Sequence, residues 1–452
     1  MKKTQLSIST THIILLSFLS VILIGSVLLS LPISSADRTS MPFLDALFTA
    51  TTSTCVTGLV VTPTVLSWSL FGQIVILILI QIGGLGVVTI MSGVMILLHK
   101  KMGIGDRLLL QDAFNLNSLS GLVRFVKKVV MGTLIIEGLG ALLYMTVFIP
   151  DFGVRGIWIS VFTAISAFCN AGIDIIAENS LCNYALNPMV NLVTSGLIIL
   201  GGIGYIVWWD VLRVLKHARR KKIKFFKNLT LHSKIAISAT LILIFAGTVL
   251  IFAFEYNNPL TMKDYALPEK IQVSVFQSVT TRTAGFATIP QENLTNASSI
   301  VCLLLMFIGG SPVGTAGGVK TVTFVILIAS AFSSIRNQDD TELFGRQLTK
   351  QAVSRAVAVT CMSFAIMFVS TVLLSAVTDA NALDIVYETV SATATVGLTR
   401  NLTASLGTPG KLIIIITMYL GRVSPISFAI AFNRKKQNQN IVKNPMEEIS
   451  VG

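Results

Sequence analysis

Charged residues are scarce in this sequence. Only 12% of its 452 residues are Asp, Glu, Lys or Arg, whereas a soluble domain normally carries about a quarter. Hydrophobic residues make up 53%, and the mean hydropathy is +0.78. The apolar blocks 12–31 and 70–98 are each long enough for a bilayer core, which takes ~20 residues. The first block also lacks a small-residue cleavage site. The sequence therefore predicts a polytopic helical membrane protein without a cleavable signal peptide.

Motifs for catalysis, cofactors and metals are also missing. The five cysteines are odd in number and scattered, which indicates neither a disulfide framework nor a zinc site. The four histidines have no metal-binding spacing. The stretch "GTAGGVKT" (314–321) lacks the spacing of a phosphate loop and lies in an apolar segment. These absences predict a protein that is not an enzyme, with no catalytic residue and no covalent cofactor.

The net charge of +13 raises the question of a nucleic-acid partner. Its distribution argues against one, because basic residues are concentrated near both ends and in the loops 98–128, 210–234 and 336–355. The positive-inside rule places these segments, and both termini, in the cytoplasm. Carboxylates favour the opposite side, where they raise the local concentration of cations. The predicted partner of the chain's surface is the lipid bilayer, not nucleic acid.

One glycine recurs along the chain at a nearly constant interval. Small or polar residues precede it and a large apolar residue follows it in "TCVTGL", "FCNAGI", "TRTAGF" and "TATVGL". The four glycines are separated by 114, 113 and 112 residues and are Gly58, Gly172, Gly285 and Gly397. Such a register indicates an internal repeat. We predict four units at 1–123, 124–229, 230–345 and 346–433, followed by a cytoplasmic tail at 434–452.

Each predicted unit has the same plan: a long apolar span, a shorter segment leading to the glycine, and a second span. The first spans lie at about 12–31, 125–149, 232–254 and 353–377, and the second at about 70–98, 189–215, 298–333 and 409–432. The shorter segments lie at about 42–54, 156–168, 269–281 and 382–394. At ~13 residues they cannot cross a bilayer, so they are predicted as re-entrant helices whose loops face water. The predicted fold is all-α, with eight spans and four pore helices in a pseudo-fourfold arrangement.

The four glycine loops are the candidate selectivity filter. Inward-pointing backbone carbonyls can replace the hydration shell of an alkali cation, and aiming them at one axis favours a positive φ, which glycine adopts without steric cost. No carboxylate occurs in these loops, and Arg282 is expected to point behind them. Thr57, Asn170, Thr283 and Thr395 are expected to hydrogen-bond the loops. The candidate ion-binding residues are Val56, Thr57, Gly58, Asn170, Ala171, Gly172, Thr283, Ala284, Gly285, Thr395, Val396 and Gly397.

A glycine-rich break interrupts the second span of the third unit. The stretch "GGSPVGTAGGVKT" (309–321) contains five glycines and a proline at mid-membrane, where both residue types break a helix. Close packing and a flexible loop across the pore are both open, and the sequence favours the loop. The sibling glycines at 82–86 and 200–204 are interpreted mainly as helix packing. The candidate residues of this pore-crossing site are Gly309, Gly310, Ser311, Gly314, Thr315, Gly317, Gly318, Lys320 and Arg422, which the family resemblance described below implies to be a gate.

Arg422 occupies the equivalent position in the fourth unit. A charge at mid-membrane costs ~2.5–3.5 kcal/mol by insertion scales and needs a partner. It either faces the pore and raises a barrier to cations, or it forms a packing ion pair with Glu137. Lys320 either anchors the glycine-rich loop or extends toward the cytoplasm. The run 216–227 either contacts anionic lipid headgroups or docks a partner protein.

Four fused units of span, pore loop and span with one filter glycine each resemble the superfamily of potassium transporters that includes the Trk, Ktr and plant HKT proteins. The resemblance covers the whole chain and is closest to the Ktr-type membrane subunit. It implies potassium as the transported ion, sodium-dependent uptake, a gate at 309–321 and a pore-facing Arg422. It also implies a homodimer with one pore per protomer, a cytoplasmic ring of nucleotide-binding (RCK-type) regulatory subunits, and a bacterial cell membrane location.

Three alternatives stay open beside the Ktr-type potassium subunit. The first is a Trk-type potassium transporter or a mixed sodium and potassium transporter. The second is a secondary carrier for another solute, which the four-fold repeat and the absence of loop carboxylates disfavour. The third is a membrane enzyme or scaffold, which the lack of a catalytic constellation or large soluble domain disfavours.

Overall fold

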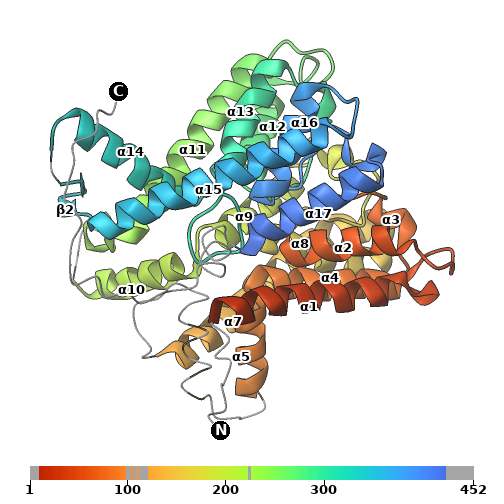
Figure 1. Cartoon of the computed structure of the whole chain (residues 1–452), viewed down its shortest axis with the longest axis horizontal. Helices are drawn as coiled ribbons and strands as arrows, with labels where there is room; N and C mark the ends of the chain where they lie inside the picture. Colours follow the sequence, from red (N-terminus) through yellow and green to blue (C-terminus); the bar gives the residue numbers. More distant parts are fainter. Residues whose placement is uncertain are drawn as a thin grey trace, which may run out of the picture.

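The computed structural model describes residues 10–97, 121–221, 225–338 and 340–423, with a few isolated positions between 103 and 110. The described chain is built almost entirely of helices, which Figure 1 shows gathered into one body with α10 and the hairpin at one edge. The predicted tail at 434–452 and much of the basic run 216–227 lie outside the residues whose side chains are described.

Four helices are long and apolar enough to cross a membrane. They are α1 (Thr10–Ser30), α7 (Leu122–Phe152), α11 (Leu231–Glu255) and α15 (Lys350–Ser375). Between 17% and 33% of their most apolar windows is buried inside the chain. The rest is exposed apolar surface, which a bilayer would cover. All four lie at the predicted first spans.

Four shorter helices are buried much more completely. They are α2 (Phe43–Cys55), α8 (Arg155–Cys169), α12 (Leu267–Thr280) and α16 (Ala382–Ala394). Their bounds agree within two residues with the segments predicted as re-entrant. The last seven residues of α2 are all buried, although five of them carry hydroxyl groups. Buried hydroxyls normally bond to protein groups, and four of these five do: Ser53, for example, donates to the carbonyl of Thr49, whereas the Thr54 hydroxyl has no partner among the described residues.

The second spans are less regular than the sequence predicts. Helices α4 (Leu70–Leu85) and α5 (Val87–Leu97) meet at 98°, and α9 (Pro188–Gly202) and α10 (Tyr205–Lys221) meet at 97°. Gly86 has φ +85° and Gly204 has φ +94° at these breaks, a backbone conformation that costs other residues steric strain. The interpretation of 82–86 and 200–204 as packing glycines is therefore incomplete. Gly84 does pack closely on Cys169, but both stretches also end a helix.

The remaining elements complete the body. The second span of the third predicted unit is divided into α13 (Asn296–Phe307) and α14 (Thr321–Ile335), one on either side of the predicted break. Helix α17 (Thr408–Val423) reaches the end of the described chain. The hairpin of β1 (Glu342–Leu343) and β2 (Arg346–Gln347) follows α14, and a single helical turn, α3 (Thr64–Ser67), precedes α4. Counting each bent pair as one, the described helices provide up to six candidate spans by length and composition.

Candidate functional site

A strained backbone turn follows each short helix, directly after α2, α8 and α16 and three residues after the end of α12. Val56, Asn170, Thr283 and Thr395 have φ values of +56°, +59°, +65° and +50°. Each stands two residues before one of the repeating glycines, which have φ values of +97°, +64°, +81° and +96°. A β-branched residue with positive φ is a genuine outlier, and Val56, Thr283 and Thr395 are all β-branched. Such strain persists where the surroundings enforce it, which is common at functional sites.

Hydroxyl groups earlier in each helix hold these turns. Thr52 Oγ1 accepts from the Gly58 amide at 2.9 Å, and Ser391 Oγ accepts from the Gly397 amide at 3.0 Å. In the other two loops Ser166 Oγ donates to the Ile173 carbonyl at 2.5 Å, and Thr280 Oγ1 donates to the Phe286 carbonyl at 2.6 Å. The sequence reasoning missed these four residues. Their signal is a hydroxyl five or six positions before each glycine.

The expected tethers do not hold their own loops. Among the described residues, the buried hydroxyls of Thr57 and Thr395 have no hydrogen-bond partner. Asn170 and Thr283 do bond, but to other parts of the chain: both meet the stretch 309–321, and Asn170 Nδ2 also donates to the Arg282 carbonyl of the third glycine loop at 3.5 Å. The prediction that these residues secure their own loops is therefore wrong for this structure, because residues within the helices already satisfy the turns.

The four glycines form a closed ring. A Cβ built on any one of them would lie closer than 3.0 Å to a carbonyl oxygen in a neighbouring loop. The contacts run from Gly58 to Ala171, from Gly172 to Ala284, from Gly285 to Val396 and from Gly397 to Thr57. The sequence period thus brings the four glycine loops together in a closed cycle, where a side chain at any of the glycines would displace a neighbouring carbonyl.

The stretch 309–321 docks on the broken end of α9. The amides of Ser311 and Thr315 donate to the carbonyls of Gly202 and Gly201 at 2.8 and 3.1 Å. In the opposite direction, the Tyr205 amide donates to the Val313 carbonyl at 2.8 Å. A helix end leaves its last carbonyls without intrahelical partners, and here the loop supplies them. The break at α9 and the break at 309–321 therefore satisfy each other.

The same loop is closed at its base by its flanking helices. The Gly309 amide donates to the Val319 carbonyl at 3.0 Å, and the Thr321 amide donates to the Gly310 carbonyl at 2.9 Å. The hydroxyls of Ser311 and Thr321 lie 2.9 Å apart. Gly318 has φ +67°. The candidate gate residues from Gly309 to Lys320 thus form one compact loop next to the ring of glycines.

Arg422 and Lys320 both bind backbone carbonyls. Arg422 Nη1 donates to the Thr315 carbonyl at 2.6 Å, and Nη2 donates to the Gly83 carbonyl at 2.5 Å. Lys320 Nζ donates to the Ala316 carbonyl at 2.5 Å, within its own loop. Lys320 therefore anchors the loop, one of the two roles left open.

Arg422 and Glu137 form no ion pair within the described residues. Glu137 instead accepts from Gln81 Nε2 at 3.2 Å, and the guanidinium of Arg422 joins the 309–321 loop to the end of α4. Arg282 is buried behind the third filter loop, as expected, with Nη2 3.3 Å from Thr240 Oγ1 on α11.

The sequence as a whole matches a known family. The family model TrkH, described as "Cation transport protein", covers residues 2–444. The chain belongs to the TrkH family. The resemblance to Trk and Ktr transporters is thereby confirmed, and the expectation of a transporter rather than an enzyme agrees with it.

Relatives of this TrkH-family chain match over nearly their whole length. It is 38% identical over 442 residues to "Ktr system potassium uptake protein B" of Bacillus subtilis, covering 98% of this chain and 96% of that protein. It is 37% identical over 460 residues to "Potassium/sodium uptake protein NtpJ" of Enterococcus hirae, covering 100% and 99%. The crystal structure of the potassium transporter TrkH from Vibrio parahaemolyticus matches with a TM-score of 0.75 at 15% identity, over 96% of this chain and 86% of that one. The structural match shows a shared fold.

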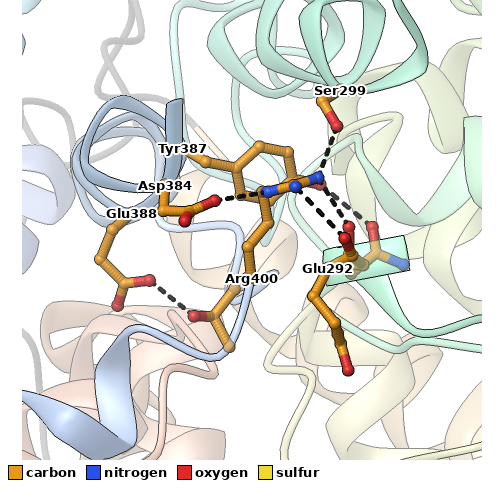
Figure 2. Close-up of polar contacts among 8 residues, drawn as sticks. Glu292, Ser299, Asp384, Tyr387, Glu388 and Arg400 are labelled. Atoms are coloured by element: carbon orange, nitrogen blue, oxygen red, sulfur yellow. Dashed lines mark hydrogen bonds and ion pairs between the residues drawn. The ribbon is translucent and has the colours of Figure 1, made fainter. Parts of the chain in front are cut away.

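The TrkH-family chain has a second arginine with many partners, in the loop after Gly397. Figure 2 shows Arg400 at the centre of a polar cluster. Its Nε donates to Asp384 Oδ1 at 2.7 Å, and Nη1 donates to Ser299 Oγ at 2.7 Å. Nη1 and Nη2 also reach the carbonyls of Gln291 and Glu292 at 3.0 and 3.2 Å. Arg400 thus fastens the loop after Gly397 to the third unit's outer loop, a role that the sequence reasoning missed.

A buried carboxylate lies beside this cluster. Glu388 is fully buried on α16 and accepts from the hydroxyls of Thr399, at 2.6 Å, and Thr403. Both threonines belong to the chain that follows the fourth filter glycine. The acidic side chain therefore ties the filter helix to its own outgoing loop, and the composition of that loop, rich in threonine, is the signal that could have indicated it.

Proposed function

We propose that this chain is the potassium-translocating membrane subunit of a bacterial Ktr-type uptake system. The observation that carries the proposal is the closed ring of four positive-φ glycines, each against a carbonyl of the next loop. Such carbonyls can replace the hydration shell of an alkali cation. The names of the full-length relatives, a potassium uptake protein and a potassium/sodium uptake protein, support potassium as the ion.

Transport along such a pore needs no chemistry of its own. A membrane potential of 100 mV supplies about 2.3 kcal/mol per monovalent cation that enters the cell. One glycine per unit gives fewer carbonyl layers than the TVGYG loops of potassium channels. We expect selectivity for potassium over sodium to be correspondingly weaker.

The proposed architecture has eight spans. Four are the long helices α1, α7, α11 and α15, and four are the second spans, each bent or divided in the described structure except α17. Basic loops on one side place both termini in the cytoplasm under the positive-inside rule. In this orientation the outer mouth carries Arg400, and the loop 309–321 lies on the cytoplasmic side of the filter.

The loop 309–321 is the proposed gate. Its three-fold attachment supports this role: it bonds to the end of α9, to its own flanking helices and to Arg422. The charge of Arg422 at this place would oppose a passing cation. To open, the loop would have to break hydrogen bonds to backbone carbonyls. Water can replace the loop as a partner of these carbonyls, whereas it cannot replace apolar packing.

The proposed assembly is a homodimer on a cytoplasmic ring of RCK-type nucleotide-binding subunits. The name of the Bacillus relative, protein B of a Ktr system, supports a partner subunit. Sodium dependence is part of the same proposal. A mixed sodium and potassium transporter is the second candidate, favoured by the name of the Enterococcus relative. A carrier for another solute has no supporting observation.

Complementation of a bacterium that lacks potassium uptake tests the filter. We expect Gly58→Ser, Gly172→Ser, Gly285→Ser and Gly397→Ser each to lower the apparent affinity for potassium by at least tenfold, because a Cβ would displace a neighbouring carbonyl. Gly196→Ser is the matched control, since a Cβ there meets nothing within 4 Å. Unchanged affinity and selectivity in all four filter variants, at wild-type protein levels, would show the filter assignment to be wrong.

A further inference from the structure

The glycine-rich loop touches the filter itself. The hydroxyl of Thr315 lies 2.9 Å from Asn170 Oδ1 and 3.0 Å from the Phe168 carbonyl, so one proton is shared between them. The Gly317 amide donates to Thr283 Oγ1 at 3.1 Å. A Cβ on Gly317 would collide with Thr395 Oγ1. The loop therefore contacts three of the four filter loops, in each case at the residue two positions before the glycine.

The first filter loop differs from the other three. Its corresponding residue is Val56, which has no polar group and lies against Gly83 of α4. Asn170, Thr283 and Thr395 are polar and meet the 309–321 loop instead. The residue two positions before the glycine is therefore polar in the three loops that contact the stretch 309–321, and valine in the one loop where it packs on α4.

We propose that Thr315 and Gly317 are positioning residues for ion selectivity, acting through Asn170 and Thr283 on the filter. This rests on the proposed potassium pore. The loop bonds to two of the filter's strained corners, Asn170 and Thr283, and packs against a third, Thr395, so the filter has its selective shape while the loop is in this position. When the loop leaves, discrimination between potassium and sodium falls. The loop then does two things at once: it obstructs the path and shapes the filter.

The physical reason is the strain at these corners. Threonine at positive φ is held in a disfavoured conformation, and such a conformation persists where surrounding contacts over-determine it. Asn170, Thr283 and Thr315 are all buried, with at most 1% exposed. A buried polar atom that loses its partner is destabilised more than the bond itself is worth. Removing the Thr315 hydroxyl is therefore expected to shift the backbone carbonyls beside Gly172, through Asn170, as well as to loosen the loop.

The test compares Thr315→Val with Thr315→Ser. Valine keeps the shape of threonine and loses the hydroxyl, whereas serine keeps the hydroxyl. Purified protein in potassium-loaded liposomes is assayed for uptake of potassium and of sodium separately. We expect Thr315→Val to lower the ratio of potassium to sodium flux by about fivefold, the effect of one buried hydrogen bond, and Thr315→Ser to restore most of it.

Two controls separate the filter effect from general damage. Ser311→Ala removes a hydroxyl pair inside the same loop without touching the filter. Thr417→Val removes the buried bond between Thr417 and Ser370, at 2.7 Å, away from both loop and filter. Neither variant removes a contact between the loop and the filter, so we expect both to keep the wild-type flux and the wild-type ratio of potassium to sodium flux.

A second variant approaches the same contact from the filter. Thr283→Val removes the acceptor of the Gly317 amide, and we expect it to lower the ratio as well. If Thr315→Val and Thr283→Val change potassium and sodium flux by the same factor, the coupling is overturned and the loop acts as an obstruction alone. If wild-type protein carries no potassium, or the glycine variants keep normal selectivity, the proposed pore fails instead.

Discussion

Two arginines that follow Gly397 in the sequence are satisfied in opposite ways. Arg400 lies 2.7 Å from the carboxylate of Asp384, and its side chain is 11% exposed. Arg422 bonds only to carbonyls, those of Thr315 and Gly83. Within the described residues no carboxylate forms an ion pair with Arg422.

Under the proposed function, this difference separates a fixed region from a movable gate. At Arg400 the charge is neutralised and its donors join two outer loops, so its loss leaves the Asp384 charge without a partner, which is costly. At Arg422 the positive charge is not neutralised, and its partners are backbone groups at two helix breaks. Water can replace such partners when the loop moves. In the proposed orientation, the neutralised Arg400 would lie at a rigid outer mouth, and Arg422, with no carboxylate partner among the described residues, would lie at the gate.

The outer clamp predicts the largest effect. Arg400→Met leaves Asp384 without its partner and removes the donors to Gln291 and Glu292, so we expect about 3 kcal/mol lower stability. The thermal midpoint of the purified protein in detergent measures this loss. Arg155→Met, at an exposed arginine, is the control and should leave the midpoint unchanged. Equal midpoints for the two variants would remove the distinction between outer and inner arginines.

The inner charge predicts an effect on transport. Arg422→Gln keeps a donor for one carbonyl and removes the charge beside the path. We expect potassium flux to rise by about tenfold, which corresponds to ~1.4 kcal/mol of barrier, with little change in thermal midpoint. Arg422→Lys keeps the charge and should stay near the wild-type flux. A large fall in stability without increased flux would assign Arg422 to the scaffold.

Glu388 provides a second test of stability in the Arg400 region. Its two hydroxyl partners are donors, and an amide offers only one acceptor in place of a carboxylate's two oxygens. We expect Glu388→Gln to lower the stability by about 1 kcal/mol, again read as a thermal midpoint. Glu178→Gln, at an exposed glutamate, should have no effect. A loss as large as that of Arg400→Met would mean that the two sites form a single network.

Replacement of Lys320, in the 309–321 loop, is expected to have the smallest effect, a change in potassium flux. Its ammonium group caps the carbonyls of Ala316 and Gly317 within the loop. Lys320→Met removes these bonds and should raise potassium flux about twofold, equivalent to ~0.4 kcal/mol, whereas Lys320→Arg should preserve the wild-type value. A lower flux in the methionine variant would indicate that Lys320 assists ion passage instead of anchoring the loop.

The short helices and the glycines could be predicted because their signals are local. The segment predicted at 382–394 coincides with α16, and Gly397 has the positive φ expected of a glycine in such a turn. A length of ~13 residues is too short to span a bilayer, and that holds before any tertiary contact is considered. Neither signal depends on a distant partner.

The helix breaks and the loop tethers could not be predicted in the same way. The bend after Gly202 depends on carbonyls that the loop 309–321 satisfies, more than 100 residues later. The tether of Gly58 is Thr52 rather than Thr57, since only the folded turn shows which hydroxyl faces the amide. The sequence offers several neighbouring hydroxyl residues of the same type, and only the folded backbone determines the direction in which each side chain points.

The sequence by itself determined the membrane class, the four-fold period and the positions that need glycine, because composition, segment length and backbone strain are properties of short stretches. The tertiary structure alone decided that the four glycines close into a ring, that Arg400 is neutralised while Arg422 is not, and which filter corners the 309–321 loop supports. Each of these depends on hydrogen-bond partners from segments far apart in the chain, and folding, not sequence proximity, selects those partners.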